Sequence, residues 1–148
     1  MQVSELLAKR GGDLYTIEPE ATVVEMVEVL NARHIGALPV IDKQGRLLGI
    51  VSERDVLRKA YDPQRRLFDC QKKVGDIMRP RSMMPVATMA TRLREAFQLM
   101  NEARTRHLAV VDEDDRVLAC ISVRDLVRCL LEMIESENRE LQNFMYGY

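Results

Sequence analysis

The feature that most constrains this chain is an internal repeat. When the sequence is shifted by 70 residues, residues 16–58 align with residues 86–128 without a gap, and eleven aligned pairs are identical. The identical pairs include Asn31/Asn101, Asp42/Asp112, Ser52/Ser122, Arg54/Arg124, Asp55/Asp125 and Arg58/Arg128. A fixed period indicates one supersecondary unit used twice, and two such units bury their apolar faces against each other. The sequence therefore predicts a pseudo-symmetric pair of small units.

The hydrophobic pattern within the first unit changes period along its length. Apolar residues recur at helical spacing over about 22–33, after the turn residues that precede Thr22. Two short apolar runs follow, Ala37–Ile41 and Leu47–Val51, separated by the hairpin turn Asp42-Lys43-Gln44-Gly45. With a first strand near residue 16, the unit is expected to have the order β-α-β-β-α.

The second unit repeats this pattern. Its first helix carries Leu93, Phe97 and Met100, and its strands are expected at Leu108–Val111 and Val117–Ile121. Short elements, Val3–Leu7 and Val74–Met78, precede the two units at a similar distance. The predicted fold class is α/β of the α+β type, with the two units packed through their sheets. The expected boundaries are 1–60 for the first unit, 61–73 for a charged linker, 74–130 for the second unit and 131–148 for a C-terminal helical extension.

Composition excludes several classes of partner. The 22 basic and 23 acidic side chains give a net charge of −1, which does not suggest nucleic acid or an anionic membrane surface as a partner. No apolar run approaches the roughly 20 residues that span a bilayer. The three cysteines have no C-x-x-C spacing, which argues against a disulfide framework or a thiolate zinc site and favours the cytoplasm. A chain of 148 residues has little room for a catalytic domain beside a regulator, so any regulated target is expected to be a separate protein.

The segment from Gly49 to Asp55 carries the candidate chemistry. It reads as a strand that runs into a helix start, where backbone N–H groups and the Ser52 hydroxyl can meet a phosphate. Asp55 lies one turn later and can accept hydrogen bonds from the two hydroxyls of a ribose. Arg54 is a candidate phosphate partner or a solvated surface arginine. Taken alone, a Ser and an Asp three residues apart at a helix start form a capping box, but this pair is duplicated at Ser122 and Asp125.

Two stretches carry a family resemblance. TIEPEATVVEMVEVLNARHIGALPVIDKQGRLLGIVSERD and VATMATRLREAFQLMNEARTRHLAVVDEDDRVLACISVRD resemble two successive CBS domains, named after cystathionine β-synthase. The family's signature is a Gly, two apolar residues, Ser or Thr, two variable residues and Asp at the end of the third strand. The resemblance implies a regulatory Bateman module without catalytic activity, whose two clefts each hold an adenosine derivative such as AMP, ADP, ATP, NAD or S-adenosylmethionine.

The resemblance also implies which residues contact the ligand. They fall at the start of the first strand, at the start of the second strand and at the end of the third strand of each unit. These residues are Thr16, Ile17, Ala37, Ser52, Arg54 and Asp55 in the first unit, and Val86, His107, Ser122, Arg124 and Asp125 in the second. The second unit departs from the pattern twice, because Ala119 replaces the signature glycine and Val86 replaces the hydroxyl of Thr16.

Other functions have less support in the sequence. His34 and His107 are not equivalent in the repeat, so a metal site is not expected, and His107 is either a ligand contact or a structural histidine. No Walker loop or nucleophile–base pair points to an enzyme. The remaining alternative is a dimeric scaffold whose clefts are vestigial. A homodimer is expected in both cases, because the apolar stripe Leu126, Leu130, Ile134, Leu141 and Met145 runs beyond what one unit can cover.

Overall fold

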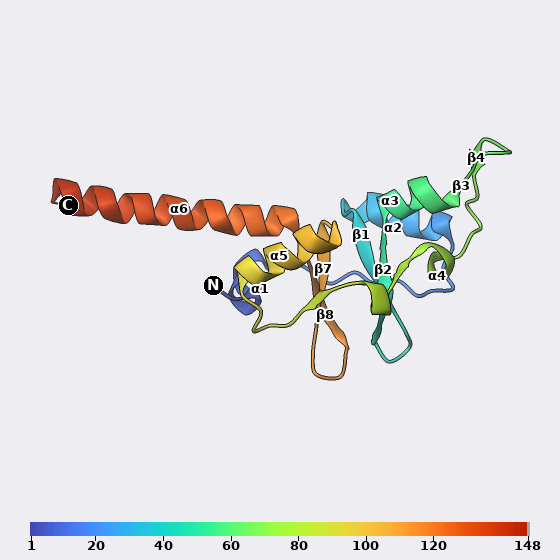
Figure 1. Ribbon diagram of the computed structural model, residues 1–148, viewed down its shortest axis with the longest axis horizontal. Helices are drawn as coiled ribbons and strands as arrows, with labels where there is room; N and C mark the ends of the chain where they lie inside the picture. Colours follow the sequence, from blue (N-terminus) through green and yellow to red (C-terminus); the bar gives the residue numbers. More distant parts are fainter. Residues whose placement is uncertain (148) are drawn as a thin grey trace.

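The computed structural model describes residues 1–147, and the two repeats lie side by side in it (Figure 1). Both repeats follow the predicted β-α-β-β-α order, although the first strand of the first repeat is reduced to a parallel bridge between Ile17 and Val40. The first repeat contains α1 (Val3–Arg10), α2 (Val23–Arg33), β1 (Ala37–Ile41), β2 (Leu47–Ser52), α3 (Glu53–Asp55) and the π-helix η1 (Val56–Ala60). The second contains α4 (Val74–Ile77), β5 (Arg79–Pro80), the 3₁₀ turn η2 (Arg81–Met83), β6 (Val86–Ala87), α5 (Leu93–Ala103), β7 (His107–Val111), β8 (Val117–Ser122) and α6 (Val123–Tyr146).

Local sequence explains where the main helices begin and end. The helix expected over 22–33 starts one residue later, because Thr22 is its N-cap. The Glu25 backbone N–H donates to Thr22 Oγ1 at 3.3 Å, and the Thr22 backbone N–H donates to the Glu25 carboxylate at 3.1 Å, which completes a capping box. At the other end, α2 stops at His34 and α5 stops at Arg104, both with left-handed backbone (φ 54° and 52°). Both repeats therefore turn from helix to strand in the same way.

The two hairpins have the same register. β1 pairs antiparallel with β2 so that Ala37 lies opposite Ser52, and β7 pairs with β8 so that His107 lies opposite Ser122. The third strand of each hairpin sheet differs, because β5 adds to the outer edge of β2 whereas β6 adds in parallel to β7. The register brings the start of the second strand and the signature serine of each unit to the same end of the hairpin.

Gly49 is required by this sheet. A Cβ at Gly49 would lie 2.4 Å from the carbonyl oxygen of Arg79 and 2.8 Å from Met78 Sδ, because β5 runs directly against β2. The signature glycine therefore permits a close approach of two backbones within the fold. Within residues 1–147, no strand pairs with the outer edge of β8, and Ala119, the equivalent of Gly49, is buried in the second core.

The leading helices of the two repeats are exchanged. Val3 and Leu6 of α1 pack in the core of the second repeat, and Val74 and Ile77 of α4 pack in the core of the first. The boundaries expected from the repeat, 1–60 and 74–130, thus describe sequence units, while each packed core takes its leading helix from the other unit.

The two units also meet through their sheets and hairpin tips. A separate buried cluster lies between the sheets and consists of Ala37, Leu47, Ile50, Met84, Ala109 and Val111. At the tips, the Leu47 N–H donates to the Asp115 carbonyl at 2.9 Å and the Val117 N–H donates to the Gly45 carbonyl at 3.1 Å. These bonds tie the two hairpins together. The buried cluster and these bonds confirm the predicted packing of the units through their sheets.

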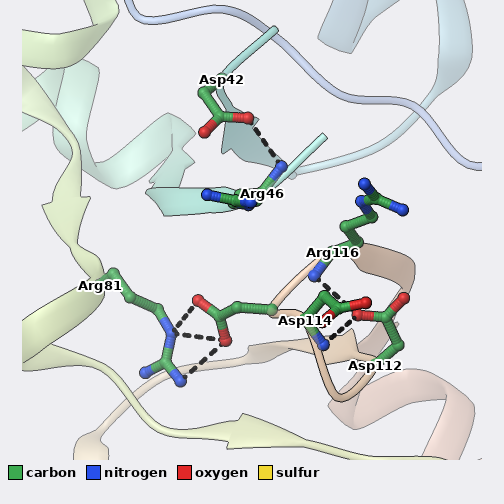
Figure 2. A network of polar contacts seen from close by, with 7 residues as sticks. Asp42, Arg46, Arg81, Asp112, Asp114 and Arg116 are labelled. Carbon is green, nitrogen blue, oxygen red and sulfur yellow. Dashed lines mark hydrogen bonds and ion pairs between the residues drawn. The ribbon is translucent and has the colours of Figure 1, made fainter. Parts of the chain in front are cut away.

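Carboxylates shape both tips (Figure 2). Asp42 accepts from the backbone of Arg46 at 2.9 Å, and Asp112 accepts from the backbone of Arg116 at 3.0 Å, so the two turns are built alike. An ion pair between Arg81 and Asp115, at 3.1 Å, adds a contact between η2 and the second tip.

The expected linker, 61–73, contains a short hairpin formed by β3 (Tyr61–Asp62) and β4 (Leu67–Phe68). Tyr61 and Phe68 face each other across it, with ring centroids 5.3 Å apart. The linker is therefore partly structured, although both rings are exposed.

The last helix, α6, extends alone from the body (Figure 1). Its first turns are anchored, because Leu126 and Cys129 are buried in the second core. Beyond them, apolar side chains are exposed along its length: Leu130, Leu131, Ile134, Leu141, Phe144 and Met145. The expected extension 131–148 is thus a continuation of the repeat's last helix, and Tyr148 lies outside the described residues. Within residues 1–147, no helix is both long and apolar enough to cross a membrane.

Candidate functional site

Two cavities lie between the units, and each contains one copy of the Ser-Asp signature. We name the cavity at the Ser52 signature the first cleft; its volume is about 420 Å³. The cavity at the Ser122 signature is the second cleft, with a volume of about 1050 Å³. Both volumes fall in or near the range of small-molecule sites.

The clefts are built alike, each mainly from three segments. The first cleft combines 52–59 of the first unit with 79–83 and 103–107 of the second. The second cleft combines 122–127 of the second unit with 10–15 and 34–37 of the first. Each signature therefore faces the helix-to-strand turn of the opposite repeat, and a ligand in either cleft touches both units.

Asp55 is preorganised in the first cleft. Its Oδ2 accepts from the Ser52 backbone N–H at 2.8 Å and lies 3.2 Å from the Ser52 hydroxyl. Its Oδ1 lies 3.7 Å from the Lys59 ammonium, one helical turn away. This pair of oxygens is half-buried and keeps capacity to accept further hydrogen bonds.

Asp125 is held more firmly in the second cleft. Its Oδ2 accepts from the Ser122 backbone N–H at 2.8 Å and from the Arg10 guanidinium at 3.0 Å. Arg10 also donates to the Cys120 carbonyl at 2.8 Å, so this arginine is fixed at the cleft wall. A ligand that uses Asp125 must share it with Arg10.

His107 lies between the two clefts and lines both of them. Burial lowers the pKa of His107, while the nearby charges of Asp125 and Glu53 act in the opposite direction. Its ring lies close to Gly36, since a Cβ there would be 3.6 Å from His107 Cε1. His107 is thus a shared, half-buried wall between the two cavities.

The other residues implied by the resemblance divide into two groups. Ala37 lines both clefts, Arg54 lines the first and Arg124 lines the second. Thr16, Ile17 and Val86 line neither cleft. Ile17 is buried in the first core, and Val86 packs against the cluster between the sheets.

The sequence prediction did not include six basic residues that line the clefts. They are Arg10, Arg58, Lys59, Arg79, Arg104 and Arg106. The sequence could have indicated Arg104 and Arg106, because the repeat places arginines there where the first unit has His34 and Gly36. No sequence pattern indicates Arg10 or Arg79, since these residues reach the clefts only through the exchange of leading segments.

Groups suited to metal binding or nucleophilic chemistry are not gathered here. Across residues 1–147, no cluster of three or more His, Cys, Asp or Glu side chains could hold a metal ion. Cys120 lines the second cleft, but burial raises the pKa of its thiol to about 12, so the thiolate is scarce at neutral pH.

Comparison with known proteins agrees with this architecture. A model of the CBS domain family matches residues 3–62 and 74–132, which together make up most of the chain. The chain belongs to the CBS domain family. The CBS domain-containing protein CBSX3, mitochondrial, of Arabidopsis thaliana is 30% identical over 151 residues, covering 98% of this chain and 72% of that protein.

Two crystal structures of CBS-domain proteins extend the likeness to the fold. The CBS-domain containing protein ATU1752 from Agrobacterium tumefaciens has a TM-score of 0.76 at 28% identity, covering 87% of this chain and 98% of that one. CBSX2 from Arabidopsis thaliana, in complex with AMP, has a TM-score of 0.73 at 28% identity, covering 89% and 97%. The tandem CBS architecture predicted from the sequence is confirmed.

Proposed function

We propose that this CBS pair is a regulatory module that binds an adenine nucleotide in the clefts between its repeats and has no catalytic activity of its own. The observation that carries the proposal is the pairing of each Ser-Asp signature with the turn of the opposite repeat. A ribose hydrogen-bonded to Asp55 would place the remainder of the nucleotide against 103–107 of the second unit. The AMP complex of CBSX2 supports an adenosine ligand.

Binding would act by changing the relation between the two units. A ligand that touches both units favours the packing for which its affinity is highest, and the population shifts toward that packing. The output would pass to a separate protein. The three free cysteines, Cys70, Cys120 and Cys129, are consistent with a reducing cytoplasm as its place of action.

We further propose a homodimer. The exposed apolar side chains of α6 need a cover that its own units do not provide, and a second copy presents the same face. This surface also favours the competing hypothesis, a dimeric interaction module whose clefts bind nothing.

One experiment separates the two hypotheses. The purified protein is denatured by heat or acid, and the released small molecules are identified by mass spectrometry. A panel of AMP, ADP, ATP, NAD and S-adenosylmethionine is then tested by thermal shift. Release of an adenosine derivative, or a rise in melting temperature with one of the panel, supports the sensing module. Absence of both supports the scaffold.

A further inference from the structure

The two clefts differ sharply in charge. Six basic side chains and two carboxylates line the first cleft, whereas three basic side chains and three carboxylates line the second. In the first cleft these are Arg54, Arg58, Lys59, Arg79, Arg104 and Arg106 against Glu53 and Asp55. In the second they are Arg10, Arg106 and Arg124 against Asp13, Glu53 and Asp125. The first cleft is strongly positive and the second is balanced, in a chain whose net charge is −1.

The difference has two sources. One is Arg58 and Lys59, whose repeat equivalents Arg128 and Cys129 line neither cleft, and the other is one pair of equivalent segments. The signature arginines are matched, since Arg54 corresponds to Arg124. The opposite walls are not matched, because the first cleft is faced by Arg104-Thr105-Arg106-His107 and the second by His34-Ile35-Gly36-Ala37. Both segments leave a helix through a left-handed residue, so the backbone path is shared and the side chains differ.

Two of the basic side chains in the first cleft are occupied within the fold. The Arg79 guanidinium donates to the carbonyls of Met83 at 2.9 Å and Ala103 at 3.0 Å. The Lys59 ammonium donates to the Ile77 carbonyl at 3.1 Å. These two groups frame the cleft and add to its positive field.

The other four guanidinium groups are open to a ligand. Among residues 1–147, no hydrogen bond or ion pair engages the side chains of Arg54, Arg58, Arg104 or Arg106. Three of them also line an adjoining groove of about 290 Å³, next to Asn101 and Phe97. The basic surface therefore continues beyond the first cleft, in the direction that a phosphate chain could follow.

We propose that the first cleft selects adenine nucleotides with a di- or triphosphate chain, whereas the second cleft accepts an adenosine derivative with at most one phosphate. This inference rests on the proposed function. A monophosphate carries about two negative charges at neutral pH, and each further phosphate adds about one. Guanidinium groups bind phosphate oxygens through paired, charge-assisted hydrogen bonds, so a longer chain gains from additional arginines. The Glu53 carboxylate opposes any anion in both clefts, but only the first holds enough positive charge to outweigh it.

Titration calorimetry of AMP, ADP and ATP tests the proposal on the full-length protein. The variant is the double substitution Arg58→Gln with Arg104→Gln, because both residues line the first cleft and not the second. The matched control is Arg128→Gln, which alters the repeat equivalent of Arg58 outside both clefts. The three substituted residues, Arg58, Arg104 and Arg128, are all exposed, and the melting temperature of each variant verifies its folding.

The wild-type protein is expected to bind ATP about tenfold or more tightly than AMP at the first cleft, with a steeper dependence on salt. In the double variant this ratio should fall to about twofold or less, because ATP should lose more affinity than AMP. Arg128→Gln should leave the ratio unchanged.

The contrary outcomes are distinct from one another. If AMP binds as tightly as ATP, or if the ratio persists in the double variant, the selectivity is overturned and the proposed function stands. If inorganic tripolyphosphate binds as tightly as ATP, the first cleft does not recognise a nucleoside and the assignment is overturned. If no adenosine ligand binds at all, the proposed function fails together with the inference.

Discussion

Replacing Asp55 by alanine is expected to weaken nucleotide binding more than replacing Asp125. The two carboxylates are equivalent in the repeat but differ in what already neutralises them. Asp55 has only the Lys59 ammonium at 3.7 Å, whereas Asp125 is bound by the Arg10 guanidinium at 3.0 Å. Because Asp125 already receives a charged donor, it gains less from ribose hydroxyls than Asp55 does.

The size of the effect follows from the hydrogen bonds that would be lost. A hydrogen bond to a charged group contributes about 1.5–3 kcal/mol, and two from one carboxylate rarely add fully, so about 2–4 kcal/mol is at stake. This corresponds to an affinity loss of about 30- to 1,000-fold. The fold should survive, since losing the cap interaction with Ser52 costs only about 1 kcal/mol.

Calorimetry with AMP, ATP and NAD on wild type, Asp55→Ala and Asp125→Ala measures this difference. Asp55→Ala should remove the tighter binding phase, and Asp125→Ala should leave it nearly unchanged. Thermal unfolding of each variant confirms that the protein remains folded. The opposite pattern, in which Asp125→Ala removes the tighter phase and Asp55→Ala retains it, would refute the ranking of the two clefts.

Four further predictions concern assembly, motion, packing and pH. Light scattering at micromolar concentration should give the mass of two chains, and the mass of one chain would contradict the role given to α6. Amide exchange in 61–73 and in α6 should change at saturating nucleotide, and unchanged exchange would remove the population-shift mechanism. Gly49→Ala should lower the free energy of unfolding, measured with denaturant, by about 1–3 kcal/mol, because the new Cβ would lie 2.4 Å from the Arg79 carbonyl oxygen. The control Gly36→Ala should change it little, because the nearest atom to its new Cβ would be 3.5 Å away. Burial holds the pKa of His107 below its usual 6.5, so the unfolded chain binds more protons than the folded one, and the free energy of unfolding should fall as pH drops below about 6.5. His107→Gln should weaken this pH dependence of the free energy of unfolding between pH 7.5 and pH 5.

The sequence predicted the parts of the fold that depend on local patterns. Thr22 and Ser122 cap helices through bonds that span three residues, and the turns at Asp42 and Asp112 are each closed within the same short segment. Such features can be recognised wherever residue type and spacing agree. The repeat then extended the same assignments from the first unit to the second.

The exchange of leading helices could not be predicted from such local patterns. Nothing local to Val3 or Leu6 indicates that they pack in the second core, because their spacing fits either unit. The exchange also brings Arg10 to Asp125, which are 115 residues apart. The sequence therefore indicated the signature residues that line the candidate clefts, and it missed Arg10 and Arg79, which reach a cleft from the opposite unit.

The geometry of α6 has a mechanical consequence. Its 24 residues span about 36 Å, and its first turns are fixed in the second core by Leu126 and Cys129. The hydrogen bonds between the hairpin tips hold the two units together at one end. A rotation of the second unit by about 5° across the helix axis would displace the free end of α6 by about 3 Å relative to its first residue, because displacement grows with length along the helix. Displacements of that size are enough to break or make side-chain contacts, so under the proposed mechanism α6 would convert a slight reorientation at the clefts into a larger displacement at its free end.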